Sequence, residues 1–142
     1  MYNCTYQEHM NVVIDTSALI EVLVNEQAPS GLVAATQGAT LLAPRSVHWE
    51  VGNAFSTMFK RKAITPERAT TALGIYGEIP LRFMDVQLGH AMELSAQLNI
   101  YAYDAYVIAC AINQQAPILT LDATLAANAQ RVGVRILEVP SV

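Results

Sequence analysis

Cysteine, long apolar runs and a secretion signal are all scarce or missing in this chain of 142 residues. Its two cysteines, Cys4 and Cys110, are too few for a disulfide framework, and reduced thiols are the simpler interpretation. No run approaches the roughly 18 apolar residues that a membrane span needs. Residues 1–9 lack the apolar segment of a signal peptide. We therefore expect a cytoplasmic protein that does not enter a membrane.

Positive charge is also in short supply. Eight Lys and Arg residues against twelve Asp and Glu residues give a net charge of −4. Nucleic-acid binders usually carry a basic surface, so charge alone does not favour that class. A hydrophobic fraction of 53% excludes intrinsic disorder and suits a packed domain. We expect one domain over residues 10–142, preceded by a flexible extension over residues 1–9.

Short apolar runs alternate with helical patterns along the whole chain. The clearest run is Val12 to Ile14, whose β-branched side chains suit a strand buried on both faces. Alternation of this kind predicts an α/β fold with a parallel sheet and helices on both faces. The strands expected on this basis span residues 12–14, 40–43, 81–84, 117–122 and 134–139.

Capping chemistry places several helix starts. Thr16 or Ser17 could cap the first helix, and Ser46 is a good cap for a long helix. Thr65 comes directly before a proline, which favours the first helical position, and Asp104 is expected to open a later helix. The helices expected from these signals and from apolar spacing span residues 17–24, 30–38, 47–62, 66–77, 87–98, 104–115 and 123–131.

Aspartate is rare, and its positions follow a pattern. Of the four aspartates, Asp15, Asp85 and Asp122 each end a strand-like run, while Asp104 begins a helix. Glu50 lies in the first turn of the helix after the second strand. Strand ends and the following helix starts share one edge of a parallel sheet, so Asp15, Glu50, Asp104 and Asp122 could converge there. Each acid alone is more often a helix cap, but together they are the oxygen ligands that Mg²⁺ or Mn²⁺ prefers.

Polar side chains accompany these acids. Asn53 lies three residues after the helical glutamate, hence on the same helical face. Thr120 lies two residues before the last aspartate, so both point to the same side of a strand. Thr16 or Ser17 could hydrogen-bond a metal-bound water or a carboxylate. All four also suit the simpler roles of cap or core hydroxyl, and the pattern leaves both open.

Four runs, VVIDTSALI, EVGNAF, YDAYVIACA and ILTLDATL, in this order, resemble the PIN-domain family and most closely its VapC-type toxins. The resemblance spans residues 10–139. It implies a three-layer fold with a central parallel five-stranded sheet between helices. It also implies a homodimer and an antitoxin protein as partner.

The resemblance further implies Mg²⁺- or Mn²⁺-dependent cleavage of RNA. By motif position, Asp15, Glu50, Asp104 and Asp122 would bind the metal and carry out catalysis, supported by Asn53 and the hydroxyls of residues 16 and 17. A PIN-like module that binds RNA or a partner without catalysis remains the alternative. Aspartyl phosphotransfer is disfavoured, because it would usually need a second acid at position 17, where a serine stands.

The aromatic residues near the acids have competing interpretations. Trp49 is expected in the core or at an interface, in preference to a base-stacking position. Tyr101 and Tyr103 could stack on nucleobases, whereas Tyr106 is expected to pack inside.

Overall fold

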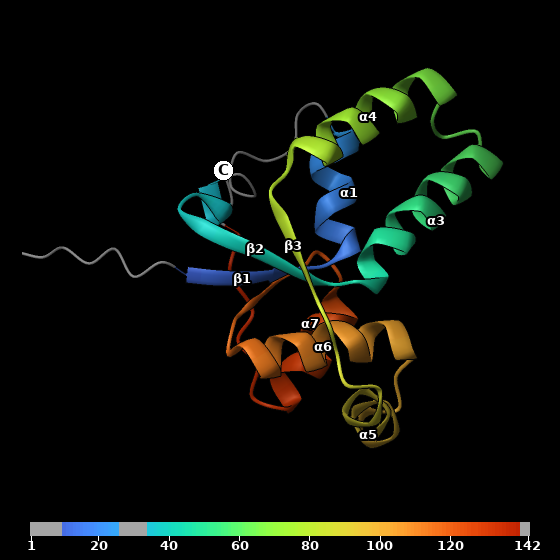
Figure 1. Cartoon of the computed structure of the whole chain (residues 1–142). Coiled ribbons are helices and arrows are strands. Elements are labelled where there is room, and N and C mark those ends of the chain that lie inside the picture. The colour runs from blue at the N-terminus through green and yellow to red at the C-terminus, as the bar shows by residue number, and fades with distance from the viewer. Residues whose placement is uncertain (1–9, 26–33, 140–142) are drawn as a thin grey trace, which may run out of the picture.

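The computed structural model describes residues 10–25 and 34–139 (Figure 1). The expected extension over residues 1–9, with Cys4, lies outside the described residues, as does the start of the helix expected over residues 30–38. In chain order the elements are β1 (Met10–Ile14), α1 (Thr16–Val24), β2 (Ala39–Pro44), α3 (Ser46–Lys60), α4 (Pro66–Glu78), β3 (Leu81–Met84), α5 (Leu88–Leu98), α6 (Ala102–Gln114), β4 (Ile118–Leu119) and α7 (Ala123–Arg131).

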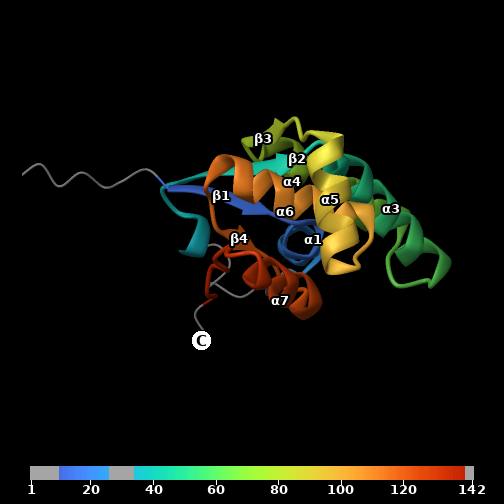
Figure 2. The ribbon, with the colours of Figure 1, turned by 90° about the horizontal axis from the view of Figure 1, so that it is seen from below.

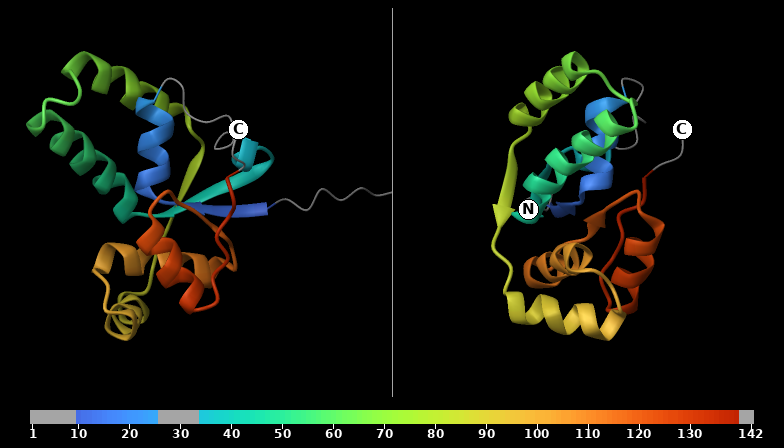
Figure 3. Two further views of the ribbon diagram at one scale, coloured as in Figure 1. Left: turned by 180° about the vertical axis from the view of Figure 1, so that it is seen from behind. Right: turned by 90° about the vertical axis from the view of Figure 1, so that its right-hand side faces the viewer.

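The strands form a parallel sheet in the order β3-β2-β1-β4. Helices α1, α3 and α4 cover one face, and α5, α6 and α7 cover the other (Figures 1, 2 and 3). This is the arrangement that right-handed crossovers produce when the chain moves outward from β1 to β3 and then returns to β4. The predicted three-layer α/β fold with a parallel sheet is confirmed.

The sheet has four strands in the described part of the chain, where five were expected. The segment expected as the fifth strand, residues 134–139, makes one isolated parallel bridge between Ile118 and Ile136. Its neighbour β4 is only two residues long, because the chain turns away after Leu119 towards α7. A strand so short offers a partner too few backbone groups for a longer ladder.

The core lies between the sheet and its helices. Val12, Val13 and Ile118 are fully buried, as expected for central strands covered on both faces. Helix α6 packs against β1 and β2 and buries a continuous run from Val107 to Ala111. Cys110 lies in this run as a free, buried thiol, and burial raises its pKa to about 11. Within residues 10–25 and 34–139, none of the helices has both the length and the apolar character that crossing a membrane requires.

Two predicted helix starts are wrong by one or two residues. Ser46 is the first residue of α3 and not its cap, because Arg45 occupies the cap position without a side-chain bond. Helix α6 begins after Tyr101, so Asp104 lies in its first turn. The cap residues Arg45 and Tyr101 are both exposed, so water can satisfy the free N–H groups that no side chain caps.

The predicted cap of α4 is confirmed, and it gives a stability test. The Thr65 hydroxyl accepts a hydrogen bond from the Arg68 backbone N–H. We expect Thr65→Ala to lower the free energy of unfolding by about 1 kcal/mol in urea titrations. The matched control is Thr71→Ala, whose exposed hydroxyl bonds a carbonyl inside the same helix and should change stability by less than about 0.5 kcal/mol. Equal effects of the two substitutions would show that the cap contributes nothing specific.

Candidate functional site

Four acids from four separate segments face the carboxyl edge of the sheet. Asp15 follows β1, Glu50 lies in α3, Asp104 lies in the first turn of α6, and Asp122 precedes α7. Their charges act on one another: Asp15 and Asp104 each raise the pKa of Glu50, and Asp122 raises the pKa of both aspartates. The structure therefore brings these four side chains into one electrostatic neighbourhood.

Asp15 is the most constrained of the four. It is 6% exposed and caps α1 by accepting a hydrogen bond of 3.1 Å from the Ala18 N–H. The prediction that Thr16 or Ser17 caps this helix is therefore wrong, because the carboxylate at the strand end reaches the free N–H groups first. The Ser17 hydroxyl instead donates to the Asp15 carboxylate, at 2.8 Å from Oδ1. These bonds hold the Asp15 carboxylate in one orientation.

Residues more than 100 positions apart complete this network. The Thr120 hydroxyl donates to Asp15 Oδ2 and accepts from the Asp122 N–H at 3.0 Å. The Ser17 hydroxyl accepts from the Leu121 N–H, also at 3.0 Å. Thr120 is buried, and its hydroxyl bonds both the Asp15 carboxylate and the Asp122 backbone. The ends of β1 and β4 are thereby tied to each other directly beneath the acids.

Burial and repulsion by neighbouring acids disfavour the charged forms of Glu50, Asp15 and Asp104. Glu50 has a pKa raised to about 7, mainly by burial and then by Asp104 and Asp15, while the nearby Thr16 hydroxyl acts in the opposite direction. Burial also raises the pKa of Asp15 and that of Asp104. Glu50 Oε2 and Thr16 Oγ1 are buried and have no hydrogen-bond partner within residues 10–25 and 34–139. An unpartnered buried carboxylate oxygen is costly unless something else coordinates it.

No basic side chain of the described residues forms an ion pair with these acids. The one ion pair within this part of the chain joins Arg45 to Asp85 at 2.6 Å, and both side chains are largely exposed. Asp85 therefore ends its strand as predicted, but it lies outside the acid cluster. Neutralising the negative charge of the cluster therefore requires a cation from outside the described part of the chain.

The donor chemistry fits a hard divalent cation, because the acids and their supporting hydroxyls offer only oxygen. The unpartnered oxygens of Glu50 and Thr16 point to the same conclusion. The four acids do not form a complete set of metal ligands in this structure. Among residues 10–25 and 34–139, no three or more His, Cys, Asp or Glu side chains are arranged to hold a metal ion.

Two pockets open along this edge. One, of about 370 Å³, lies beside Glu50. Asn53 lines it together with Glu50, as the helical spacing predicts. Trp49 also lines it and is 76% exposed. Of the two positions expected for Trp49, the core is therefore wrong, and the interface stays a prediction. Trp49 comes three residues after the start of α3 and points out of the fold, which apolar spacing alone does not show. The lining of this pocket consists of Thr16, Trp49, Glu50, Asn53, Ala54 and Tyr103.

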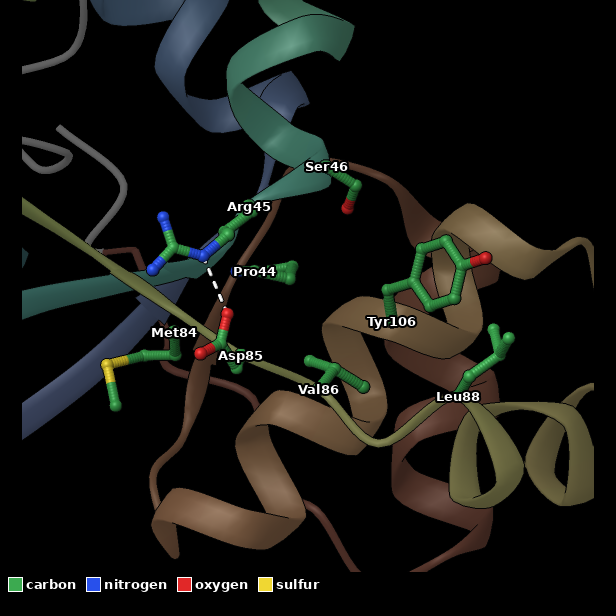
Figure 4. A pocket seen from close by; sticks show the side chains of 8 residues that line it. All are labelled: Pro44, Arg45, Ser46, Met84, Asp85, Val86, Leu88 and Tyr106. Carbon is green, nitrogen blue, oxygen red and sulfur yellow. Dashed lines mark hydrogen bonds and ion pairs between the residues drawn. The ribbon is translucent and has the colours of Figure 1, made fainter.

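The second pocket, of about 240 Å³, lies at the ends of β2 and β3 (Figure 4). The Arg45–Asp85 pair spans one side of it, and Tyr106 from α6 forms another wall. Ser46 contributes a buried hydroxyl that finds no hydrogen-bond partner in the described part of the chain. Sequence reasoning missed this pocket, because the pairing of Arg45 with an acid 40 residues away has no local signal.

The sequence matches the model of the PIN domain family over residues 12–130. The chain belongs to the PIN-domain family. The family resemblance drawn from the four sequence runs is thereby confirmed. No curated protein sequence is similar enough to count as a match.

Solved structures share this PIN fold at low sequence identity. PAE2754 from Pyrobaculum aerophilum has a TM-score of 0.64 at 16% identity, covering 84% of this chain and 86% of its own. VapBC2 from Rickettsia felis, bound to a DNA fragment from its promoter, has a TM-score of 0.64 at 19% identity, covering 91% and 98%. VapC20 from Mycobacterium tuberculosis, a toxin that cleaves the sarcin-ricin loop, has a TM-score of 0.63 at 16% identity, covering 91% and 99%.

Proposed function

We propose that this PIN-domain protein is a Mg²⁺- or Mn²⁺-dependent ribonuclease and the toxin of a toxin–antitoxin pair. The observation that carries the proposal is a cluster of four carboxylates at the carboxyl edge of a PIN-domain sheet. They repel one another and have no ion-pair partner among the described residues. The similarity in fold to VapC20 supports RNA as the substrate.

Each acid has a distinct place in the proposed site. Asp15 and Asp104 would be the primary metal ligands, and Glu50 and Asp122 would complete or orient the set. Bound Mg²⁺ or Mn²⁺ would supply Lewis acidity and an activated water for attack on the phosphodiester. The protein itself holds the carboxylate oxygens close together. Their burial and mutual repulsion are unfavourable, and a bound cation would offset both.

The supporting side chains fix this arrangement. Ser17 and Thr120 hold the Asp15 carboxylate, so its orientation does not depend on the metal. Thr16 lines the same pocket as Glu50. Asn53 lines the same pocket as Glu50 and would contact the substrate or a bound water. Removing a side chain that orients a metal ligand typically lowers metal affinity or activity by about 10- to 100-fold.

The similarity in fold to VapBC2 from Rickettsia felis supports an antitoxin protein as partner. We also propose a homodimer in the cytoplasm. The alternative, a PIN module that binds RNA or a partner without catalysis, is weakened by the presence of all four acids.

Incubation of the full chain with a generic single-stranded RNA and Mn²⁺ tests the proposal. We expect cleavage that stops when EDTA is added, with products carrying a 5′-phosphate and a 3′-hydroxyl. A 2′,3′-cyclic phosphate on the product would contradict the metal-dependent route. RNA that binds but stays intact with either metal would favour the non-catalytic alternative.

A further inference from the structure

We propose that the pocket between α3 and α6 binds a nucleobase of single-stranded RNA, with the rings of Trp49 and Tyr103 stacking against it. The proposal rests on the proposed function, because it takes RNA as the substrate, and it adds how the strand is held. The pocket is the one of about 370 Å³ beside Glu50.

Two large aromatic side chains lie in solvent at this pocket. Trp49 is 76% exposed and Tyr103 is 57% exposed, and both line the cavity from different helices. The residues are more than 50 positions apart in the sequence, so the fold, and no local pattern, brings them together. Exposed rings of this size forgo the free energy that burial would give them, and a partner that covers them recovers it.

Neighbouring aromatic rings hold both side chains in place. Trp49 contacts His48 edge to face, with ring centroids 4.8 Å apart and planes at 75°. Tyr103 contacts Tyr106 in the same way, at 6.0 Å and 83°. His48 is fixed in turn by a hydrogen bond of 2.9 Å between its Nδ1 and the Tyr76 hydroxyl. Rings that are already oriented lose little conformational freedom when a base stacks on them.

The position of the pocket suits a nucleotide next to the cleaved bond. Glu50 lines the same pocket as Trp49 and Tyr103, so a base stacked on these rings lies beside a proposed metal ligand. The exposed Asn53 amide lies in the same lining and offers both a donor and an acceptor to a base edge. A base held here places its phosphodiester beside the acids.

Stacking also resolves the charge problem that the composition raises. The lining of the pocket contains no Lys or Arg, and the chain as a whole carries a net charge of −4. Phosphate contacts need cations, but stacking on aromatic rings requires none, since every base has a π-face. An acidic protein can therefore hold RNA by its bases and leave the phosphates to the metal.

The chain has one tryptophan, so its fluorescence reports on position 49 alone. We would titrate the full chain with a short oligoadenylate, with Ca²⁺ in place of Mn²⁺, and then with an abasic oligonucleotide of the same length. We expect quenching by the oligoadenylate and no change with the abasic strand. Tyr103→Ala should weaken binding by about 10- to 100-fold while leaving the reporter in place.

Phe59→Ala is the matched control, because Phe59 is an exposed aromatic side chain of α3 that lies outside the pocket lining. It should change affinity by less than about twofold. In cleavage assays, Trp49→Ala and Tyr103→Ala should raise KM by a similar 10- to 100-fold with little change in kcat, and Trp49→Phe should restore much of the loss. A purely structural role for these rings would not give this split between KM and kcat.

The outcomes separate this proposal from the proposed function. Cleavage of RNA with equal quenching by the abasic strand would overturn the base pocket and leave the ribonuclease intact. Base-dependent quenching without cleavage would support the pocket and contradict the ribonuclease. A fluorescence change that follows protein concentration or an added protein partner, with no response to RNA, would identify a protein interface and overturn the proposal.

Discussion

Asp104→Asn is expected to lower kcat/KM for Mn²⁺-dependent RNA cleavage by about 10²- to 10³-fold. The substitution keeps the shape of the side chain but removes one negative charge and one strong oxygen ligand. A metal contributes several kcal/mol to the stabilisation of charge in the transition state, and losing one member of such a preorganised set costs a comparable amount. Radiolabelled RNA and initial rates over a range of Mn²⁺ concentrations would measure the loss.

Asp85→Asn is the matched control for this experiment. Asp85 is the one aspartate of the chain that lies outside the acid cluster, and its side chain is 85% exposed and paired with Arg45. Removing an exposed ion pair costs about 0–1 kcal/mol of stability, so activity should stay within about twofold of the wild type. Equal activity of the wild type and both variants would remove Asp104 from the proposed site. Equal losses in both variants would point to a general effect of charge.

The positions of β1, β2 and β3 could be predicted because they depend on local composition, whereas the strand expected over residues 117–122 is only Ile118–Leu119. Val12 and Val13 are completely buried, as a β-branched run in a central parallel strand should be. The start of α4 was equally local, because Thr65 and the proline after it carry both capping signals. Where a side chain and its nearest neighbours determine the structure, the sequence is sufficient.

Other features depend on partners far away in the chain. The fifth strand is reduced to the Ile118–Ile136 bridge because β4 ends after two residues, and nothing in the apolar run 134–139 shows this. The end of β4 is fixed by Thr120, whose hydroxyl reaches Asp15 across 105 positions of sequence. Contacts of this kind follow from topology and packing, which a local pattern does not contain.

The candidate site likewise has features that the sequence could predict and others that it could not. Parallel topology alone predicts that acids at strand ends and helix starts share an edge, and Asp15, Glu50, Asp104 and Asp122 do act on one another there. Their metal-binding and catalytic roles stay predictions. The exposure of Trp49 was not predictable, because an aromatic residue in an amphipathic helix usually faces the core.

The metal-free protein is expected to lose stability as pH rises from about 5 to 8. Glu50 has a pKa of about 7 in the folded state, against an ordinary value of 4.5. Between these values the folded protein holds a proton that the unfolded chain has released, so the free energy of unfolding falls as pH rises through this range. Asp15 and Asp104 face Glu50, and their own pKa values are also raised, so they act in the same direction. With allowance for solvent screening, the loss should be about 1–2 kcal/mol, or a fall in Tm of about 5 °C.

Adding Mn²⁺ at pH 8 should reverse this loss, because the ion favours the charged carboxylates that repulsion disfavours. At 100 times its Kd, a ligand specific for the folded state adds about 2.7 kcal/mol, which corresponds to a rise in Tm of about 10 °C. Glu50→Gln should flatten the pH dependence without metal and reduce the response to Mn²⁺, whereas Asp85→Asn should follow the wild type in both. Calorimetry at several pH values measures the four curves. An identical Mn²⁺ response in Glu50→Gln and Asp85→Asn would show that Glu50 takes no part in binding the ion. A Tm independent of pH would contradict the raised pKa that burial and the neighbouring acids give Glu50.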